Sequence, residues 1–467
     1  MSKEIRNIIG DFMSEKKAKS NDFVDRQSKI CTTNDLIPQE LYTEYDVKKG
    51  LRDKSGKGVL TGLTNISRVD GFANVDGVRT PCEGCLWYRG YDVFNLVKGF
   101  EGASDIHGFE ESAYLLLFGN LPTAEQLQNF KEVIGENRTL PSTFIRDVIL
   151  KGHSKDIMNS ITKSVLTLAA YDPDMSNCAI DNVLRQSIGL ISVFPMLAVY
   201  GYQAYSYYDC ENSLIIHRPR PDLSVAENIL MMLRPDGKYT ELEAKVLDIA
   251  LVLHMEHGGG NNSTFTTRVV TSTGSDTYSV IAAAMSSLKG PKHGGANIKV
   301  VEMIDDIKEN VSNLEDRDEL EAYLTKILDK KAFDGAGLIY GMGHAVYSIS
   351  DPRAKIFKVF ADKLATEKHR EKDFELYCTI EDIAPGLISS RRNAFTGVSA
   401  NVDFYSGFIY DMLGIPEELF TPLFATARVV GWCAHRIEEL VNSGKIIRPA
   451  YQSVMSERQY VPIDKRE

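Results

Sequence analysis

The chain has 467 residues, of which 43% are hydrophobic and 25% are charged, so it is an ordinary globular protein long enough for two domains. Its net charge of −11 argues against binding to nucleic acid or to an anionic membrane. The longest apolar run, Ile188 to Tyr200, is interrupted by Ser192 and Pro195 and is shorter than the roughly 20 residues that span a bilayer. Acidic substrates would therefore need a local cluster of Arg and His side chains.

Residues 1–45 form a charged N-terminal extension that mixes acidic and basic side chains and contains no apolar signal core. We therefore expect a cytoplasmic protein. Its seven cysteines, an odd number, are expected to be reduced thiols. Cys82 and Cys85 form a single CxxC, and because no second pair completes a zinc site, a structural turn is favoured there.

Two segments, 62–71 and 86–96, alternate polar and apolar residues between glycines and predict a short β region. The remainder has helical spacing, with capping pairs at Thr123 and Gln126 and at Thr240 and Glu243. The predicted helices after the β region are 109–118, one from Thr123, 223–233, one from Thr240, 278–288, 298–310, 314–330, one from Pro352 to about Lys368, 401–413, and one from Thr421 that ends at Gly444. The sequence predicts a mainly α-helical protein.

His254 and His257 come at the end of the helix that starts at Thr240, and their spacing would place them on one helix face. Such a pair can bind a metal, which leaves a zinc-dependent hydrolase as one alternative. The HExxH spacing is absent and no nearby cysteine adds a ligand, so we expect no metal.

Two glycine-rich loops each carry one histidine. His293 lies in GPKHGGAN, where Gly290 and Pro291 end one helix and the free amides of the next helix face the loop. That loop suits a small anion or a thioester carbonyl. His344 lies in GMGHAVY. Asp403, in NVDFYSG, falls in the first turn of a helix, where the macrodipole is expected to lower its pKa.

Taken together, GPKHGGAN, GMGHAVYSISDPRA, NVDFYSG and ATARVVGW, in this order, resemble the signature of the citrate synthase family. The resemblance covers about residues 50–450. It implies an all-α, two-domain fold with the active site in the cleft between the domains. The implied large domain comprises 46–293 and 403–467, and the small domain comprises 294–402. The resemblance also implies a homodimer or an assembly of dimers.

The implied reaction condenses acetyl-CoA with oxaloacetate and hydrolyses citryl-CoA to citrate and CoA. By similarity, Asp403 is the base, His293 stabilises the enol and His344 polarises the oxaloacetate carbonyl. The residues implied for the substrate carboxylates are His257, Arg353, Arg428 and, from the neighbouring subunit, Arg448. Those implied for CoA, the co-substrate, are Leu338, Ile339, Gly341, Gly343 and Asn401. The resemblance implies no tightly bound cofactor.

Two alternatives lie within this resemblance. A 2-methylcitrate synthase uses propionyl-CoA with the same catalytic residues, and one methylene changes discrimination by only about 1 to 3 kcal/mol. A catalytically inactive CoA-binding or sensing protein could also have this fold. The presence of His293, His344 and Asp403 together counts against an inactive protein.

Overall fold

The computed structural model describes residues 23–53, 57–76, 78–101, 107–391, 397–442 and 444–466, and the chain divides into two compact units at Leu63 and Thr64. In the first unit, residues 23–34 are helical and are followed by α2 (Gln39–Glu44) and the short helix η1 (Lys49–Leu51). About half of the expected N-terminal extension, residues 1–22, lies outside the described residues.

The second unit begins with an antiparallel sheet in the order β1 (Ser67–Val75), β2 (Val78–Tyr88) and β3 (Tyr91–Asp92). The β region lies where it was expected, but its strands have other ends. Strand β2 starts before the second predicted segment, 86–96, and helix α3 (Val93–Glu101) begins within that segment. Cys82 and Cys85 lie within β2 and not in the turn that their spacing favoured.

The other helices of this unit follow the predicted order, with additional ones between them. They are α4 (Gly108–Phe118), α5 (Ala124–Glu136), η2 (Ile145–Leu150), α6 (Ile157–Leu168), η3 (Ala169–Tyr171), α7 (Ile180–Tyr208), α8 (Val225–Leu233), α9 (Glu241–His254), α10 (Asn262–Thr271), α11 (Thr277–Leu288), α12 (Ala296–Asn310), α13 (Arg317–Leu328), α14 (Pro352–Lys368), α15 (Glu371–Arg391), α16 (Val402–Met412), η4 (Glu417–Leu419), α17 (Phe420–Asn442) and η5 (Ile463–Lys465). The protein is mainly α-helical, as predicted.

Local capping chemistry explains several helix starts. Both predicted capping boxes form, one at Thr123 with Gln126 and one at Thr240 with Glu243. Asp351 caps α14 and is followed by a proline at the first helical position. The start of α17 was predicted one residue too late, because the turn of η4 leads directly into Phe420.

Helix α7 has 29 residues, and by length and hydropathy it could cross a membrane. Of its most apolar window, 78% is buried inside the protein, which is typical of the core helix of a globular domain. Pro195 lies within this helix.

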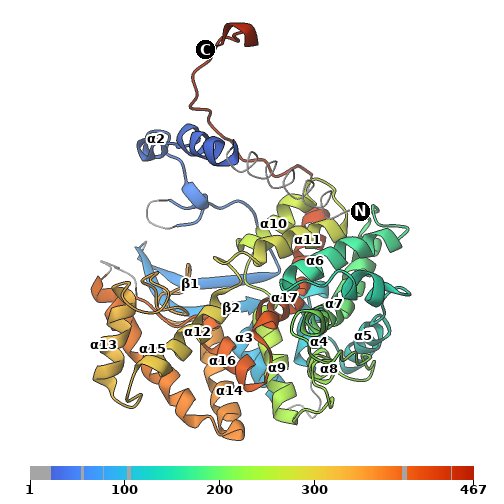
Figure 1. The fold of residues 1–467 in the computed structure, drawn as a ribbon. Helices are drawn as coiled ribbons and strands as arrows, with labels where there is room; N and C mark the ends of the chain where they lie inside the picture. Colours follow the sequence, from blue (N-terminus) through green and yellow to red (C-terminus); the bar gives the residue numbers. More distant parts are fainter. Residues whose placement is uncertain are drawn as a thin grey trace, which may run out of the picture. The chain divides into compact units, whose positions relative to one another are not determined.

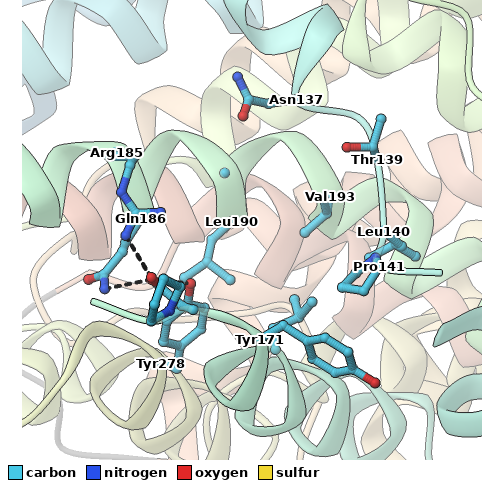
Figure 2. Close-up of a pocket in the computed structure, with 14 residues that line it drawn as sticks. Asn137, Thr139, Leu140, Pro141, Tyr171, Arg185, Gln186, Leu190, Val193 and Tyr278 are labelled. Carbon is cyan, nitrogen blue, oxygen red and sulfur yellow. Dashed lines mark hydrogen bonds and ion pairs between the residues drawn. The ribbon is translucent and has the colours of Figure 1, made fainter. Parts of the chain in front are cut away.

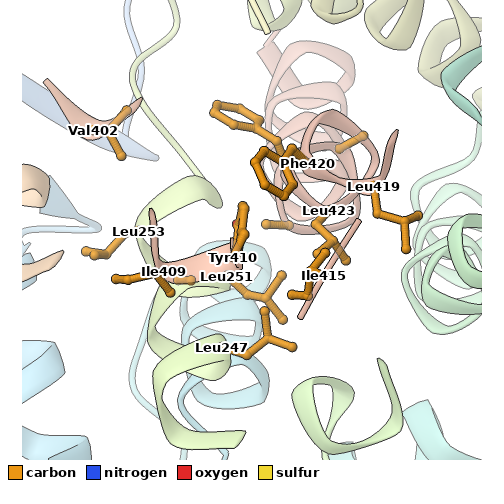
Figure 3. Close-up of a cluster of buried hydrophobic side chains, with 14 of the residues drawn as sticks. Leu247, Leu251, Leu253, Val402, Ile409, Tyr410, Ile415, Leu419, Phe420 and Leu423 are labelled. Atoms are coloured by element: carbon orange, nitrogen blue, oxygen red, sulfur yellow. The ribbon is translucent and has the colours of Figure 1, made fainter. Parts of the chain in front are cut away.

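Helix α17 is the central helix of the second unit, and it packs against α4, α7, α9, α10 and α11 (Figure 1). Another group of contacts joins α12 with α16, α13 with α15, and α14 with α15 and α16. Apolar side chains from α9, α16 and α17, including Leu251, Ile409 and Leu423, meet in the core between these groups (Figure 3). The implied boundaries of the large and small domains stay a prediction.

Candidate active site

A short backbone pairing joins the loop that carries His344 to the helix that carries Asp403. Gly343 N donates to Ser399 O and Asn401 N donates to Gly341 O, both at 2.8 Å. The φ angles of Gly341 and Gly343 are 77° and 87°, in a region that favours glycine. Two segments about 60 residues apart in the sequence are thereby held side by side.

The imidazole of His344 has a defined proton position. Its Nδ1 accepts hydrogen bonds from the backbone N–H of Val346 at 3.0 Å and of Tyr347 at 3.2 Å. A nitrogen that accepts carries no proton, so the proton of the neutral ring lies on Nε2. This ring can therefore donate from Nε2 to a carbonyl oxygen.

His257 lies in the loop after α9, because that helix ends at His254. The expectation that the two histidines share a helix face is wrong. Instead, the rings of His257 and His344 meet edge to face with centroids 5.1 Å apart. Burial and the positive charge of Arg353 hold the pKa of His257 well below its usual value, which favours a neutral ring.

His293 lies in the turn between α11 and α12, as predicted. Its Nε2 is 3.1 Å from Asn261 Oδ1 and 3.3 Å from Ser263 Oγ, both at the start of α10. Burial, followed by the charge of Arg428, lowers the pKa of His293 to about 4. The imidazole is therefore neutral at pH 7, with burial as the largest cause.

Arg353 is almost completely buried at the start of α14 and is paired with the helix cap. Its Nε and Nη2 donate to the two carboxylate oxygens of Asp351 at 3.0 and 2.7 Å. Asp351 also accepts from the backbone N–H of Val402 at 3.2 Å, which ties α14 to α16. Asp351 thus neutralises Arg353 within the chain.

Arg428, in the middle of α17, is completely buried. Its Nε donates to the backbone oxygen of His254 at 2.7 Å, while its Nη1 has no hydrogen-bond partner among the described residues. Burial lowers its pKa to about 10, and the charge of Glu256 only partly offsets this effect. A buried cation with an unused donor is the expected feature of a binding site for an anion.

Asp403 lies in the first turn of α16, two residues after the cap Asn401. Burial raises its pKa to about 6, while Arg353 and Arg428 act in the opposite direction. The expectation of a lowered pKa is therefore wrong, because loss of solvent outweighs the favourable helix dipole. A carboxylate with this pKa is ionised at neutral pH and basic enough to accept a proton.

The other residues that the resemblance implies for CoA or for the substrate include Asn401, Leu338, Ile339 and Arg448. The side-chain oxygen of Asn401 accepts from Asp403 N and its Nδ2 donates to Gly343 O, so Asn401 connects the segments that carry Asp403 and His344. Leu338 is 40% exposed and Ile339 is buried in the loop before Gly341. Arg448 is exposed in the segment that follows α17. Their contacts with CoA or with a second subunit stay predictions.

A pocket of about 480 Å³ lies elsewhere, between the first half of α7 and the loop that contains Asn137 to Pro141 (Figure 2). The carboxylate in its lining is already paired, since Asp172 accepts from Arg185, Gln186 and Tyr278. None of the predicted catalytic residues lines it.

Sequence reasoning missed four residues that support the site, namely Asn261, Ser263, Trp432 and Tyr347. Asn261 and Ser263 hold His293, and Trp432 Nε1 donates to Ser263 Oγ at 3.1 Å. Tyr347 contacts both His257 and His344. Tyr347 is the last residue of GMGHAVY, three residues after His344, but only the fold brings it to His257.

Comparisons with known proteins show the family to which the chain belongs. A family model described as citrate synthase, C-terminal domain, matches residues 54–450. The chain belongs to the citrate synthase family. It is 35% identical to citrate synthase from Deinococcus radiodurans, over 77% of this chain and 89% of that protein. It is 33% identical to 2-methylcitrate synthase 1 from Corynebacterium glutamicum, over 91% of this chain and all of that protein.

The fold is also similar to that of solved citrate synthases. Citrate synthase from the archaeon Thermoplasma acidophilum, solved as a ternary complex with carboxymethyl coenzyme A and oxaloacetate, has a TM-score of 0.73 and 30% identity. The match covers 90% of this chain and 99% of that one. The family and its solved structures support an acyltransferase that condenses an acyl group.

Proposed function

We propose that the protein is a citrate synthase that condenses acetyl-CoA with oxaloacetate and hydrolyses citryl-CoA to citrate and CoA. The observation that carries this proposal is the buried Arg428, whose Nη1 has no partner among the described residues. Oxaloacetate is a dicarboxylate, and one of its carboxylates would supply the acceptor that this guanidinium lacks.

Asp403 is the proposed base. The methyl proton of a thioester is a very weak acid, so its removal requires a base and a donor for the developing enol oxygen. His293 is the proposed donor. Its Nε2 lies 3.1 Å from Asn261 Oδ1, an oxygen that only accepts, so the proton of the neutral ring lies on Nε2 in this structure and would have to leave Asn261 to reach the thioester oxygen.

His344 is the proposed electrophile for the second substrate. Its Nε2–H would donate to the ketone oxygen of oxaloacetate while the enol carbon attacks the ketone carbon. Arg353, Arg428 and His257 would hold the carboxylates. The charge of Arg428 acts on Asp403, His257 and His293, which supports one shared site for both substrates.

A homodimer in which Arg448 of one copy completes the site of the other is part of the proposal. Arg448 is exposed, and large apolar side chains around it are exposed too, including Ile446 at 63% and Tyr451 at 96%. A second copy of this chain would cover these side chains. Mass measurement in solution tests the dimer, and Arg448→Ala would raise the KM for oxaloacetate.

The test of the proposed function is thiol release by the purified protein with acetyl-CoA, with and without oxaloacetate. We expect release that depends on oxaloacetate and produces citrate. Release that does not depend on oxaloacetate would contradict the proposal.

A 2-methylcitrate synthase is the second candidate. The two relatives named above, one of each activity, are 35% and 33% identical to this chain. The ratio of kcat/KM for acetyl-CoA and propionyl-CoA decides between them. A preference for propionyl-CoA would replace citrate by 2-methylcitrate as the product.

A further inference from the structure

Tyr347 touches both imidazoles of the proposed oxaloacetate site. Its ring stacks on His344 with centroids 4.8 Å apart and an angle of 25° between the planes. Its hydroxyl is 3.2 Å from His257 Nε2, and its backbone N–H donates to His344 Nδ1 at 3.2 Å. The side chain is 1% exposed.

We propose that Tyr347 is a positioning residue that fixes the ring orientation and the proton position of both His257 and His344, and thereby sets the affinity for the keto dicarboxylate. This inference rests on the proposed function and extends it to a residue that the resemblance does not assign.

The backbone and ring of Tyr347 act on His344. The N–H of Tyr347, together with that of Val346, occupies Nδ1 and leaves the ring proton on Nε2. The stacked phenol covers one face of the imidazole and limits its rotation. His344 is therefore held as an Nε2 donor before substrate arrives, which lowers the reorganisation that binding requires.

The hydroxyl of Tyr347 acts on His257. The phenol has one proton and two acceptors within reach, Cys85 O at 3.3 Å and His257 Nε2 at 3.2 Å. A substrate carboxylate can only accept, so His257 must offer it an N–H from Nδ1. The neutral ring then has a bare Nε2, so the Tyr347 hydroxyl, which lies within reach of Cys85 O, turns to donate to Nε2 when the substrate binds. As this donor, Tyr347 places the proton of the neutral His257 ring on Nδ1.

The β1–β2 hairpin holds Tyr347 in this place. A Cβ at Gly84 of β2 would lie 2.6 Å from Tyr347 Cδ1 and 2.0 Å from Ser350 O, so no larger residue fits. A Cβ at Gly71 of β1 would lie 2.4 Å from Val346 O. Glu83, beside Gly84, bonds to the hydroxyl of Ser350. The hairpin is therefore the rigid support of the His344 loop.

The test uses Tyr347→Phe, which keeps the stacked ring and removes only the hydroxyl. We expect the Kd for oxaloacetate, measured by calorimetry without acyl-CoA, to rise about tenfold. The KM for oxaloacetate should rise with it, while kcat and the KM for acetyl-CoA change less than about twofold. Tyr347→Leu, which also removes the stack, should in addition lower kcat.

Tyr323→Phe is the matched control, since it removes the hydroxyl of a tyrosine on α13 that donates to Asp306 of α12 at 2.7 Å, outside the site. It should leave both KM values unchanged. Unchanged binding of oxaloacetate to Tyr347→Phe, or an equal loss for both substrates, would overturn the proposal. A wild-type protein that does not bind oxaloacetate would instead contradict the proposed function.

Discussion

Two buried arginines, Arg353 at the start of α14 and Arg428 in the middle of α17, have opposite electrostatic surroundings. Burial lowers the pKa of both, but the charge of Asp351 and two hydrogen bonds to its carboxylate outweigh that effect and raise the pKa of Arg353. Arg428 forms no hydrogen bond to a carboxylate among the described residues, and burial lowers its pKa to about 10. The pair of Arg353 and Asp351 also stabilises the fold, because Asp351 ties α14 to α16, whereas Arg428 keeps one donor, Nη1, without a partner among the described residues.

The charges of both arginines lower the pKa of Asp403, so substitution of Asp403 is expected to have the largest effect. We expect Asp403→Asn to lower kcat about 1000-fold, because no other base replaces the carboxylate. The Kd for oxaloacetate should change little. Thiol release and calorimetry measure the two quantities, and a variant that retains turnover would refute the role of Asp403 as base.

Arg428→Met should weaken oxaloacetate binding about 100-fold, because a buried carboxylate loses its charged donor. The free energy of unfolding should stay equal or increase, since the variant removes a buried cation that has an unused donor. Calorimetry and denaturant unfolding check these outcomes. Normal binding would show that the substrate anion uses other residues.

Asp351→Asn tests the paired arginine. We expect the free energy of unfolding to fall by about 2 kcal/mol, because hydrogen bonds to a buried charge are weakened. Denaturant unfolding measures this change. Lys358 provides a comparison, since its ion pair with Glu381 is partly exposed and Lys358→Ala should cost less than about 1 kcal/mol. Equal losses for both variants would contradict the assigned role of Asp351.

The pH dependence of kcat/KM should report the pKa of Asp403. The base acts when ionised, so activity should fall as pH drops below about 6, the pKa to which burial raises this carboxyl. At pH 5 we expect about one tenth of the plateau value. His293, with a pKa of about 4, stays neutral in this range. A plateau that extends to pH 5 would contradict this assignment.

Local signals in the sequence were sufficient for most of the helical framework. The caps at Thr123, Thr240 and Asp351 formed as predicted, because a cap involves residues within one turn of each other. The extent of the β strands was less predictable, since strand ends depend on pairing with a partner strand. The placement of His257 failed for a similar reason, because only the packed structure shows that α9 ends at His254.

The amino-acid sequence alone determined the family, the helical class and the identity of the residues proposed for catalysis, because these follow from residue types at fixed spacing. Tertiary structure decided how those residues behave. The raised pKa of Asp403, the unpaired donor of Arg428 and the contact of Tyr347 with two histidines all depend on burial and on neighbours distant in the chain. Desolvation and charge coupling act through space, so no local pattern in the sequence predicts them.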